Sequence, residues 1–253
     1  MKWISGLLVS AGLLQAALGG ELRVVSYNIK HGQGMDGEID LERVAAVIAK
    51  KKPDLVALQE VDRNCRRSGN RDIAAELGKL LGMEHRFGKS IDHDGGEYGV
   101  AVLSKLPITG LNHYKLPGGD ERRTALEVQV TVKGSEMPVS FVSVHNDWST
   151  EAVRLGQVAA LLDGLKKVKH PVILAGDFNG ELEDGSMKLL VKEGWTVLDK
   201  NGAKTAPSDV PKVEIDFVVT RGLKAKLIEH AAIEERVVSD HWPIFAVWQF
   251  SGE

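Results

Sequence analysis

The feature that most constrains this chain is a series of short apolar runs, each of which ends in an acid, an amide or an imidazole. The runs LVAL at 55–58 and VILA at 172–175 are uninterrupted, which is typical of strands covered on both faces. A polar group at the end of such a run costs free energy unless it is paired or binds a ligand. The pattern therefore predicts a layered fold with a polar site at its strand ends.

The arrangement of strands and helices predicts the fold class. Apolar residues recur at helical spacing within 41–48, 73–81 and 158–165, with Asp40 as an N-cap and Gly82 as a stop. Helices and strands alternate unevenly and several strands follow one another directly, which predicts a mixed-sheet α/β sandwich. The proline-containing segment 200–212 predicts a loop. Eight strands are predicted: 22–29, 54–60, 99–104, 125–132, 138–145, 171–177, 214–220 and 244–250.

The first twenty residues differ from the rest of the chain. Lys2 is their only charge, an apolar stretch follows it, and the segment ends in AALGG. This pattern predicts a secretory signal peptide at residues 1–20. An uncleaved anchor is the weaker alternative, because a spanning helix needs ~20 predominantly apolar residues. We expect a secreted or periplasmic monomer without stable membrane insertion after cleavage, folded as one domain over residues 21–253.

The charge of the chain bears on its partners. The net charge is −3, and loss of Lys2 makes it −4, so the overall field does not attract polyanions. Nucleic acid remains a candidate substrate only through local basic patches. Most of the arginines near the strand ends are interpreted as a solvated basic surface, although one or two are placed to bind a substrate phosphate. These arginines are Arg63, Arg66, Arg67, Arg71, Arg122 and Arg123.

The polar residues at the strand ends each have a structural and a functional interpretation. Glu60 follows four apolar residues and needs a cation or hydrogen-bond donors if it is buried. Asp177 and Asn179 are typical of a tight turn, but they also lie where open α/β sheets bind ligands. Taken alone, His145 is typical of a hydrogen-bonded histidine in the core, and Asn28 is typical of an amide that caps a nearby backbone group.

One pair of residues suggests proton transfer. Asp216 lies inside an apolar strand and needs a partner, for which His241 is the candidate. An imidazole with a carboxylate behind it is how a general base is oriented.

Taken together, these segments resemble the endonuclease/exonuclease/phosphatase superfamily, whose fold is DNase I-like. Any one of the motifs is weak, but seven of them occur in the order of that family and span residues 22–250. They are Ser26-Tyr27-Asn28, Leu58-Gln59-Glu60, the run from Tyr98 to Ser104, His145, Gly176-Asp177-Phe178-Asn179, Ile215-Asp216-Phe217 and Ser239-Asp240-His241.

The resemblance implies a four-layer α/β/β/α sandwich, with two mixed sheets flanked by helices, and hydrolysis of a phosphoester with Mg²⁺ or, in some members, Mn²⁺. It implies a metal held by Glu60, with Asn28 and Asp240 near it. Oxygen ligands of this kind suit Mg²⁺.

The resemblance also implies roles in catalysis. Asp177 orients or deprotonates water, Asn179 holds a phosphate oxygen, His241 with Asp216 stabilises charge or acts as the base, and His145 is a candidate acid. Around them, Tyr98 and Arg122 are predicted to contact substrate and Glu97 to orient His145. After His145 the chain reads Asn146-Asp147-Trp148, where many relatives have Leu before the Asp, so no relative's substrate is carried over.

Three functions remain open at this stage. The first is a secreted phosphodiesterase acting on nucleic acid, a small diester or a phospholipid headgroup. The second is a phosphomonoesterase acting on an inositol phosphate or a nucleotide. The third is a binding module without catalysis, which predicts that one or more of the acids or histidines would be missing. All of the expected residue types are present in this chain.

Overall fold

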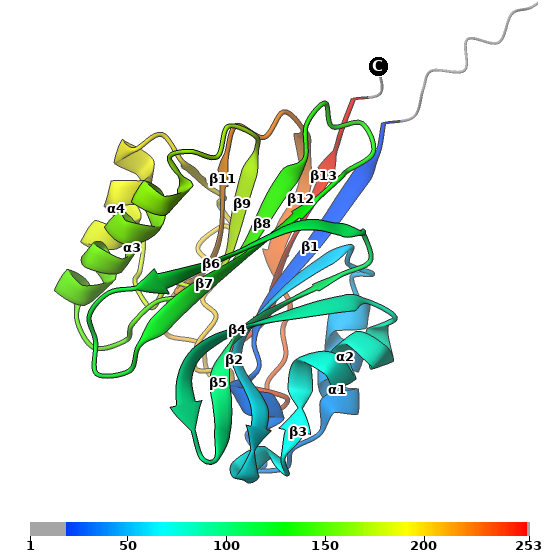
Figure 1. The fold of residues 1–253 in the computed structure, drawn as a ribbon, viewed down its shortest axis with the longest axis vertical. Coiled ribbons are helices and arrows are strands. Elements are labelled where there is room, and N and C mark those ends of the chain that lie inside the picture. The colour runs from blue at the N-terminus through cyan, green and yellow to red at the C-terminus, as the bar shows by residue number, and fades with distance from the viewer. Residues whose placement is uncertain (1–18, 252–253) are drawn as a thin grey trace, which may run out of the picture.

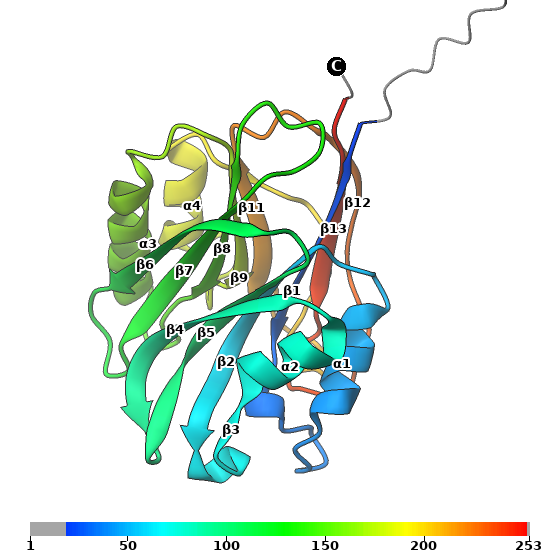
Figure 2. The ribbon, with the colours of Figure 1, turned by 45° about the vertical axis from the view of Figure 1, so that its right-hand side comes forward.

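Two β-sheets face each other in this protein, and a pair of helices covers the outer face of each (Figure 1). The computed structural model describes residues 19–251. Helices α1 and α2 pack on the first sheet, and helices α3 and α4 lie on the far side of the second (Figure 2). The predicted four-layer α/β/β/α sandwich with mixed sheets is confirmed. The predicted signal peptide lies outside the described residues, apart from its last two positions.

The first sheet has the strand order β12-β13-β1-β2-β5-β4, with β3 paired to β2 at one side. Strands β1 and β2 run parallel, and their neighbours run antiparallel to them. The strands are β1 (Glu21–Asn28), β2 (Leu55–Cys65), β3 (Arg71–Asp72), β4 (Glu84–His93), β5 (Gly96–Ser104), β12 (Lys226–Ala232) and β13 (Ile244–Gln249).

The second sheet has the strand order β10-β11-β9-β8-β7-β6. Its one parallel pair is β8 with β9. The carboxyl ends of β8, β9 and β1 meet at one edge of the sandwich, where the bulge of β2 at Glu60 also lies. The strands are β6 (Ile108–Leu116), β7 (Arg123–Val130), β8 (Val139–His145), β9 (Val172–Asp177), β10 (Thr196–Val197) and β11 (Asp216–Arg221).

Each of the four α-helices within residues 19–251 is preceded by a residue whose side chain accepts from a free backbone N–H of its first turn. Asp40, as predicted, accepts from the N–H of Arg43 at 2.9 Å, and Gly82 ends the second helix in the left-handed region. The helices are α1 (Leu41–Ala49), α2 (Ile73–Leu81), α3 (Glu151–Leu165) and α4 (Gly185–Lys192), and two short 3₁₀ turns are η1 (Lys30–Gly32) and η2 (Arg66–Ser68).

Three apolar layers hold the sandwich together, one between the sheets and one under each helix pair. Each fully buried Val, Leu, Ile or Phe in them stabilises the fold by roughly 1.5–3 kcal/mol. A polar link crosses between the sheets below the site: Gln59 Nε2 donates to Ser143 Oγ at 3.1 Å, and Ser143 Oγ donates to the carbonyl of Leu58 at 3.1 Å. This link holds β2 and β8 in register at the polar edge.

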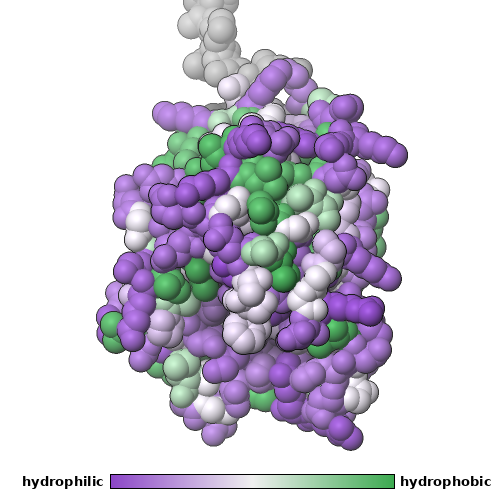
Figure 3. Space-filling view, turned by 90° about the vertical axis from the view of Figure 1, so that its left-hand side faces the viewer, coloured by the Kyte–Doolittle hydropathy of each residue, from purple (hydrophilic) through white to green (hydrophobic). Residues whose placement is uncertain are grey.

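The sequence predicted the central strands and missed the outer ones. All eight predicted strands and three helices are present, and residues 200–212 form a loop. The strands β4, β6, β10 and β12, the two-residue β3 and helix α4 were not predicted. The face that carries α3 and α4 is mostly hydrophilic, with apolar side chains confined to part of it (Figure 3). Within residues 19–251, none of the helices is long and apolar enough to cross a membrane.

Candidate active site

The strand register brings the predicted polar residues to one place. Asp177 ends β9, where it is paired on one side with His145 at the end of β8 and on the other with Asp216 at the start of β11. Asn28 ends β1 of the facing sheet. Because parallel strands end at the same edge of a sheet, residues that are far apart in sequence meet here.

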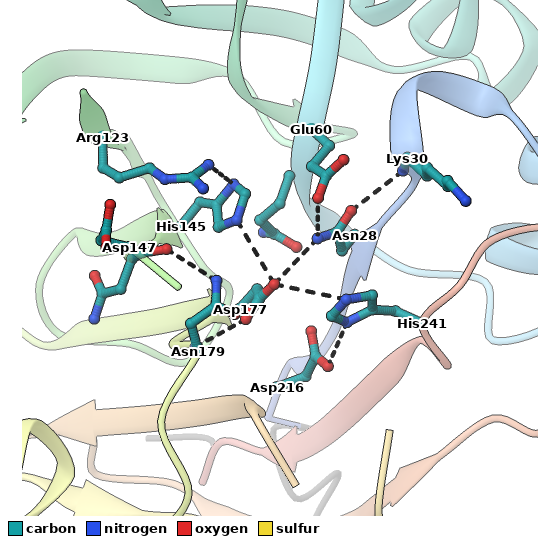
Figure 4. A network of polar contacts seen from close by, with 12 residues as sticks. Asn28, Lys30, Glu60, Arg123, His145, Asp147, Asp177, Asn179, Asp216 and His241 are labelled. Atoms are coloured by element: carbon teal, nitrogen blue, oxygen red, sulfur yellow. Dashed lines mark hydrogen bonds and ion pairs between the residues drawn. The ribbon is translucent and has the colours of Figure 1, made fainter. Parts of the chain in front are cut away.

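One oxygen of Asp177 is the centre of this cluster (Figure 4). Its Oδ2 accepts a hydrogen bond from Asn28 Nδ2 at 3.1 Å. The same oxygen lies 3.7 Å from His145 Nε2 and 3.8 Å from His241 Nε2. Both imidazole distances are too long for hydrogen bonds, so two ring nitrogens face a buried carboxylate with space between them.

Glu60 is presented by a bulge in β2. The pairing of β2 with β5 shifts between Leu58 and Val61, and Glu60 has a φ of 56°, in the left-handed region that non-glycine residues rarely adopt. Its Oε1 accepts from Asn28 Nδ2 at 3.0 Å. The Asn28 amide therefore joins the carboxylates of Glu60 and Asp177, and the backbone is strained where the side chain is turned toward the site.

Asn179 follows Asp177 in a second left-handed conformation, with a φ of 51°. Its N–H donates to Asp177 Oδ1 at 2.8 Å, and its Nδ2 donates to the carbonyl of Asn146 at 2.9 Å. One of the two amide hydrogens is thereby used to fix the side chain, and the other remains for a ligand oxygen.

His241 and Asp177 form a buried pair with altered acidities. His241 Nδ1 donates to Asp216 Oδ2 at 2.9 Å. Burial alone would lower the pKa of His241, but the carboxylates of Asp216 and Asp177 outweigh it and raise that pKa to about 10. Burial raises the pKa of Asp177 to about 7 against the opposing charge of His241. Perturbed groups of this kind are concentrated at functional sites.

His145 is neutral, and its tautomer is fixed by an arginine. Arg123 Nη1 lies 3.1 Å from His145 Nδ1, and because a guanidinium only donates, the ring proton is on Nε2, which faces Asp177. Burial, and then the charges of Arg123 and His241, hold the pKa of His145 well below its usual value. His145 thus carries an Nε2–H that is free to donate to a ligand, without carrying a positive charge.

Asp240 and Lys30 complete the side of the site next to Glu60. Lys30 Nζ lies 3.5 Å from Asp240 Oδ2, and Ser239 Oγ donates to the carbonyl of Asn28 at 2.7 Å, which ties this loop to β1. Burial, and to a lesser extent the charge of Asp240, raises the pKa of Glu60. The carboxylates of Glu60 and Asp240, with the amide oxygen of Asn28 near them, are oxygen ligands of the kind that suits a hard divalent cation.

A second group of potential ligands fits a metal less well. Among the described residues, Asp177, Asp216 and His241 offer ligand atoms within 4.8 Å of one another. However, His241 Nδ1 is already bonded to Asp216. This trio is therefore a hydrogen-bonded acid–base unit, and Glu60 with Asp240 remains the better metal site.

The prediction that Glu97 orients His145 is wrong. Glu97 Oε2 accepts from Arg63 Nε at 2.7 Å, and its Oε1 lies 3.2 Å from Lys89 Nζ. Both ring nitrogens of His145 face other groups, Arg123 and Asp177. Glu97 lies at the outer end of the β4–β5 hairpin, where surface cations neutralise it.

The cavity beside Glu60 shows which other residues reach the site. It has a volume of about 230 Å³ and is lined by Glu60, Arg67, Tyr98, Arg123 and Trp148, among others. Tyr98 lines this cavity, with its hydroxyl 3.4 Å from Arg123 Nη1, and its contact with substrate stays a prediction. Arg122 is exposed and lines a neighbouring cavity of about 620 Å³, together with Lys89, Lys115 and Arg123.

Sequence reasoning missed the roles of Arg123 and Lys30. The sequence shows Arg123 only as part of the basic pair Arg122-Arg123. Which of two consecutive residues points inward depends on a strand register that the sequence does not give. Lys30 follows Asn28 by two positions and has a φ of 44°. That backbone conformation is what brings a side chain just outside the strand back toward Asp240.

Comparison with known proteins agrees with this geometry. The profile of the Endonuclease/Exonuclease/phosphatase family matches residues 25–241. No curated protein matches the chain significantly in sequence. A solved endonuclease/exonuclease/phosphatase from Beutenbergia cavernae DSM 12333 is 23% identical, with a TM-score of 0.77 over 92% of this chain and 72% of that one.

Two further solved structures carry named activities or ligands. The mannosyl-6-phosphatase of Bacteroides thetaiotaomicron VPI-5482 is 17% identical, with a TM-score of 0.73 over 89% of this chain and 98% of that one. The human Nocturnin catalytic domain, solved with a bound sulfate anion, is 19% identical, with a TM-score of 0.70 over 91% and 94%. At these identities the likeness shows a shared fold.

Proposed function

Because the chain belongs to the endonuclease/exonuclease/phosphatase family, we propose that it hydrolyses a phosphoester with the help of a divalent cation, Mg²⁺ or Mn²⁺. The observation that carries the proposal is the buried Asp177 carboxylate, which faces two imidazole nitrogens at 3.7 and 3.8 Å and is joined through Asn28 to Glu60. Acids, amides and imidazoles arranged around one open point are what phosphoryl transfer requires.

In this proposal the cation is held by Glu60, with Asp240 and Asn28 beside it. When bound there, it would polarise a phosphoryl oxygen and lower the pKa of a nearby water molecule. The same positive charge would favour the ionised form of Asp177. Lys30, which pairs with Asp240, keeps the local charge balanced.

The residues of the chain divide the remaining work. Asp177 takes a proton from the attacking water, since its raised pKa makes it a stronger base than an ordinary carboxylate. Protonated His241, held by Asp216, stabilises negative charge on the phosphoryl group, and the free amide hydrogen of Asn179 binds one of its oxygens. Neutral His145 donates a hydrogen bond from Nε2–H to an oxygen of the phosphoryl group or of the leaving alcohol. As the P–O bond breaks, that alcohol oxygen takes up a proton from solvent water, and Asp177 returns its proton to solvent.

A phosphodiester is the first candidate substrate. A diester carries an organic group on each side of its phosphorus, and two adjoining cavities, of about 230 and 620 Å³, share Arg123. The larger of them has the cations Lys89, Lys115 and Arg122 in its lining, which suits a substrate with a further negative charge.

A phosphomonoester of a small alcohol is the second candidate. The arginines that leave β2 are ion-paired, as in Arg63 with Glu97, Arg66 with Asp94 and Arg71 with Glu76. Neutralised arginines offer little attraction for a polyanion. A fold neighbour named as a mannosyl-6-phosphatase shows that the fold accommodates a monoesterase.

The two candidates are separated by comparing bis(4-nitrophenyl) phosphate with 4-nitrophenyl phosphate, each with Mg²⁺ and with EDTA. A diesterase prefers the first ester by its kcat/KM, and EDTA abolishes the reaction. Asp177→Asn is expected to lose most of the turnover. Asp163→Asn, which changes an exposed acid of α3, is its matched control. No hydrolysis of either ester, of DNA, of RNA or of sphingomyelin by the wild-type protein would contradict the proposal.

The place of action also remains a proposal. The pattern of residues 1–20 supports export, followed by activity as a monomer in the periplasm or outside the cell. Mass spectrometry of the protein recovered from an exporting host would show a mature chain that begins near residue 21, and a full-length chain would contradict export with cleavage.

A further inference from the structure

Trp148 is placed unlike the other tryptophans of the described chain. Its side chain is 69% exposed, whereas Trp195 and Trp248 are 4% and 2% exposed and Trp242 is half-buried. A single exposed apolar residue is ordinary on a protein surface. What distinguishes Trp148 is that its backbone is fixed and that it lines the cavity next to Glu60.

The backbone around Trp148 is held from three directions. The N–H of Asp147 donates to Gln157 Oε1 at 2.8 Å, and the N–H of Ser149 donates to Asp147 Oδ1 at 2.7 Å. Arg154 Nη1 donates to the carbonyl of Trp148 at 3.3 Å, while its Nη2 pairs with Asp184 at 2.6 Å. An exposed ring on a fixed backbone loses little conformational entropy when a ligand covers it.

The cavity that Trp148 lines is contiguous with the catalytic residues. Glu60 and Arg123 belong both to its wall and to the polar cluster described above. Its volume of about 230 Å³ is that of about seven or eight water molecules at roughly 30 Å³ each. One small ring fits this space.

The charges in the cavity are balanced. Arg67 is bound in two places by the fully buried Asp62, at 2.8 and 2.8 Å. Arg123 Nη1 pairs with Glu121 at 2.7 Å. A second phosphate group of the substrate would be attracted only weakly by these guanidinium groups, because carboxylates already neutralise them. A neutral ring with hydroxyl groups, in contrast, can both donate to the glutamates and accept from the arginines.

We propose that Trp148 is a specificity residue that stacks on a neutral, hydroxylated ring in the alcohol part of the substrate, either the ring of a sugar phosphate or the nucleoside of a nucleotide. The inference rests on the proposed function, because it takes the position of the phosphate from the cluster around Asp177. With the phosphate there, the esterified group extends past Glu60 and Arg123, and its ring lies against the indole. Stacking of rings on aromatic side chains is a general means of recognition.

Binding is tested by fluorescence in Asp177→Asn protein, which holds ligand without turning it over. The probes are glucose 6-phosphate, adenosine 5′-monophosphate, glycerol 3-phosphate and inorganic phosphate, each added with Mg²⁺. Trp148 is the most exposed of the described tryptophans, so acrylamide quenches it preferentially. We expect the two ring-bearing probes to protect it and the two ringless probes not to do so. The double variant with Trp148→Phe identifies the part of the signal that comes from Trp148.

Affinity gives a second measurement on the same proteins. Trp148→Ala weakens the binding of the ring-bearing probe by about ten-fold in Kd, which equals about 1.4 kcal/mol, and Trp148→Phe retains most of the affinity. Val191→Ala, at an exposed position of α4, is the control for loss of surface apolar area. Whichever ring-bearing probe binds more tightly identifies the sugar or the nucleoside as the source of the ring.

The outcomes separate this inference from the proposed function. Equal protection by glycerol 3-phosphate and the ring-bearing probes, or no protection by any of them, overturns the inference. If wild-type protein hydrolyses no phosphoester while ring-bearing probes still protect Trp148, the proposed function fails and the binding site stands. If it hydrolyses phosphoesters without such protection, the ring subsite alone is wrong.

Discussion

Two buried carboxylates of the second sheet, Glu127 on β7 and Asp177 on β9, have opposite surroundings. Glu127 is fully buried and accepts from Asn112 Nδ2 at 2.9 Å, Tyr114 Oη at 2.5 Å and the hydroxyl of Ser140. Burial would raise the pKa of Glu127, but these hydrogen bonds outweigh it and lower that pKa. The pKa of Asp177 is instead raised to about 7.

The difference separates a structural acid, Glu127, from Asp177, the acid to which the proposed function gives a role in catalysis. Neutral donors from neighbouring strands satisfy Glu127, so its charge stabilises the fold and nothing more needs to bind. Asp177 is kept in an environment that disfavours its charge, with two imidazoles just beyond hydrogen-bonding distance. Such an arrangement lowers stability and is retained where function requires it.

The largest expected effect is that of Asp177→Asn. The amide cannot accept a proton from water, so kcat falls by about 10²–10⁴-fold. When both proteins are measured in EDTA, the variant has a higher melting temperature than the wild type, because a neutral amide replaces a buried carboxylate with a raised pKa. Circular dichroism and a turnover assay on one preparation check both effects. Wild-type turnover in the variant would remove Asp177 from the mechanism.

Glu127→Gln is expected to have the opposite effects: it lowers stability and leaves kcat unchanged. It loses charge-assisted hydrogen bonds in the interior, so the free energy of unfolding falls by roughly 1–3 kcal/mol, or about 2–4 °C of melting temperature per kcal/mol. Activity well below the melting temperature stays at the wild-type level. Urea unfolding measures the loss. A fall in kcat at unchanged stability would show that Glu127 acts on the site.

The Glu127 contribution also has a defined pH dependence. Its folded-state pKa lies below the ordinary value of 4.5, so its stabilisation is present above about pH 4.5 and is lost as the pH falls. Wild-type protein therefore loses more stability on acidification than Glu127→Gln does. Equal acid sensitivity of the two proteins would contradict this assignment.

The two consecutive arginines offer a smaller contrast. Arg123 contacts His145 and Tyr98, so Arg123→Ala lowers kcat/KM by about ten-fold or more through loss of a charge-assisted contact. Arg122 is exposed, and Arg122→Ala changes kcat/KM by less than about three-fold. Steady-state kinetics on both variants measure these losses. A larger loss of kcat/KM in Arg122→Ala than in Arg123→Ala would mean that the larger cavity holds the phosphate.

The smallest effect expected is a shift of the pH profile. In the proposed mechanism activity requires Asp177 ionised and His241 protonated, so without added charge nearby we expect it to rise through a pH of about 7 and to fall above about 10. A bound cation moves the lower limb to lower pH. Asp216→Asn removes the carboxylate that contributes most to the raised pKa of His241, so the upper limb moves down. An unchanged upper limb would mean that His241 does not titrate in that range.

How far the sequence predicts the fold depends on where a strand lies. The central strands, such as β9 with its run from Val172 to Ala175, are buried on both faces and are recognised by continuous apolar residues. The missed strands β4, β6, β10 and β12 are the four outer strands of the two sheets. Strands β4, β6 and β12 carry charged residues that protect free edges, and β10 has only two residues, so no apolar run or alternation marks them.

The site was predictable in its residue types and less so in its contacts. The buried acids, amides and imidazoles stand out because each would be costly in an apolar strand. The contacts of Glu97, Arg123 and Lys30 were not predictable, because they depend on strand register, on the hairpin of β4 and β5 and on left-handed backbone at Lys30. Tertiary pairing sets those features, and local sequence does not.

The central claim is that the polar edge, and not the Glu127 network, is built to receive a divalent cation. Anomalous scattering from crystals soaked in Mn²⁺ locates that cation directly. The account predicts a peak in contact with the Glu60 carboxylate, next to Asp240, that disappears in Glu60→Gln. Absence of any peak at Glu60 in wild-type crystals, or a peak bound only by Asp177, Asp216 and His241, would contradict it.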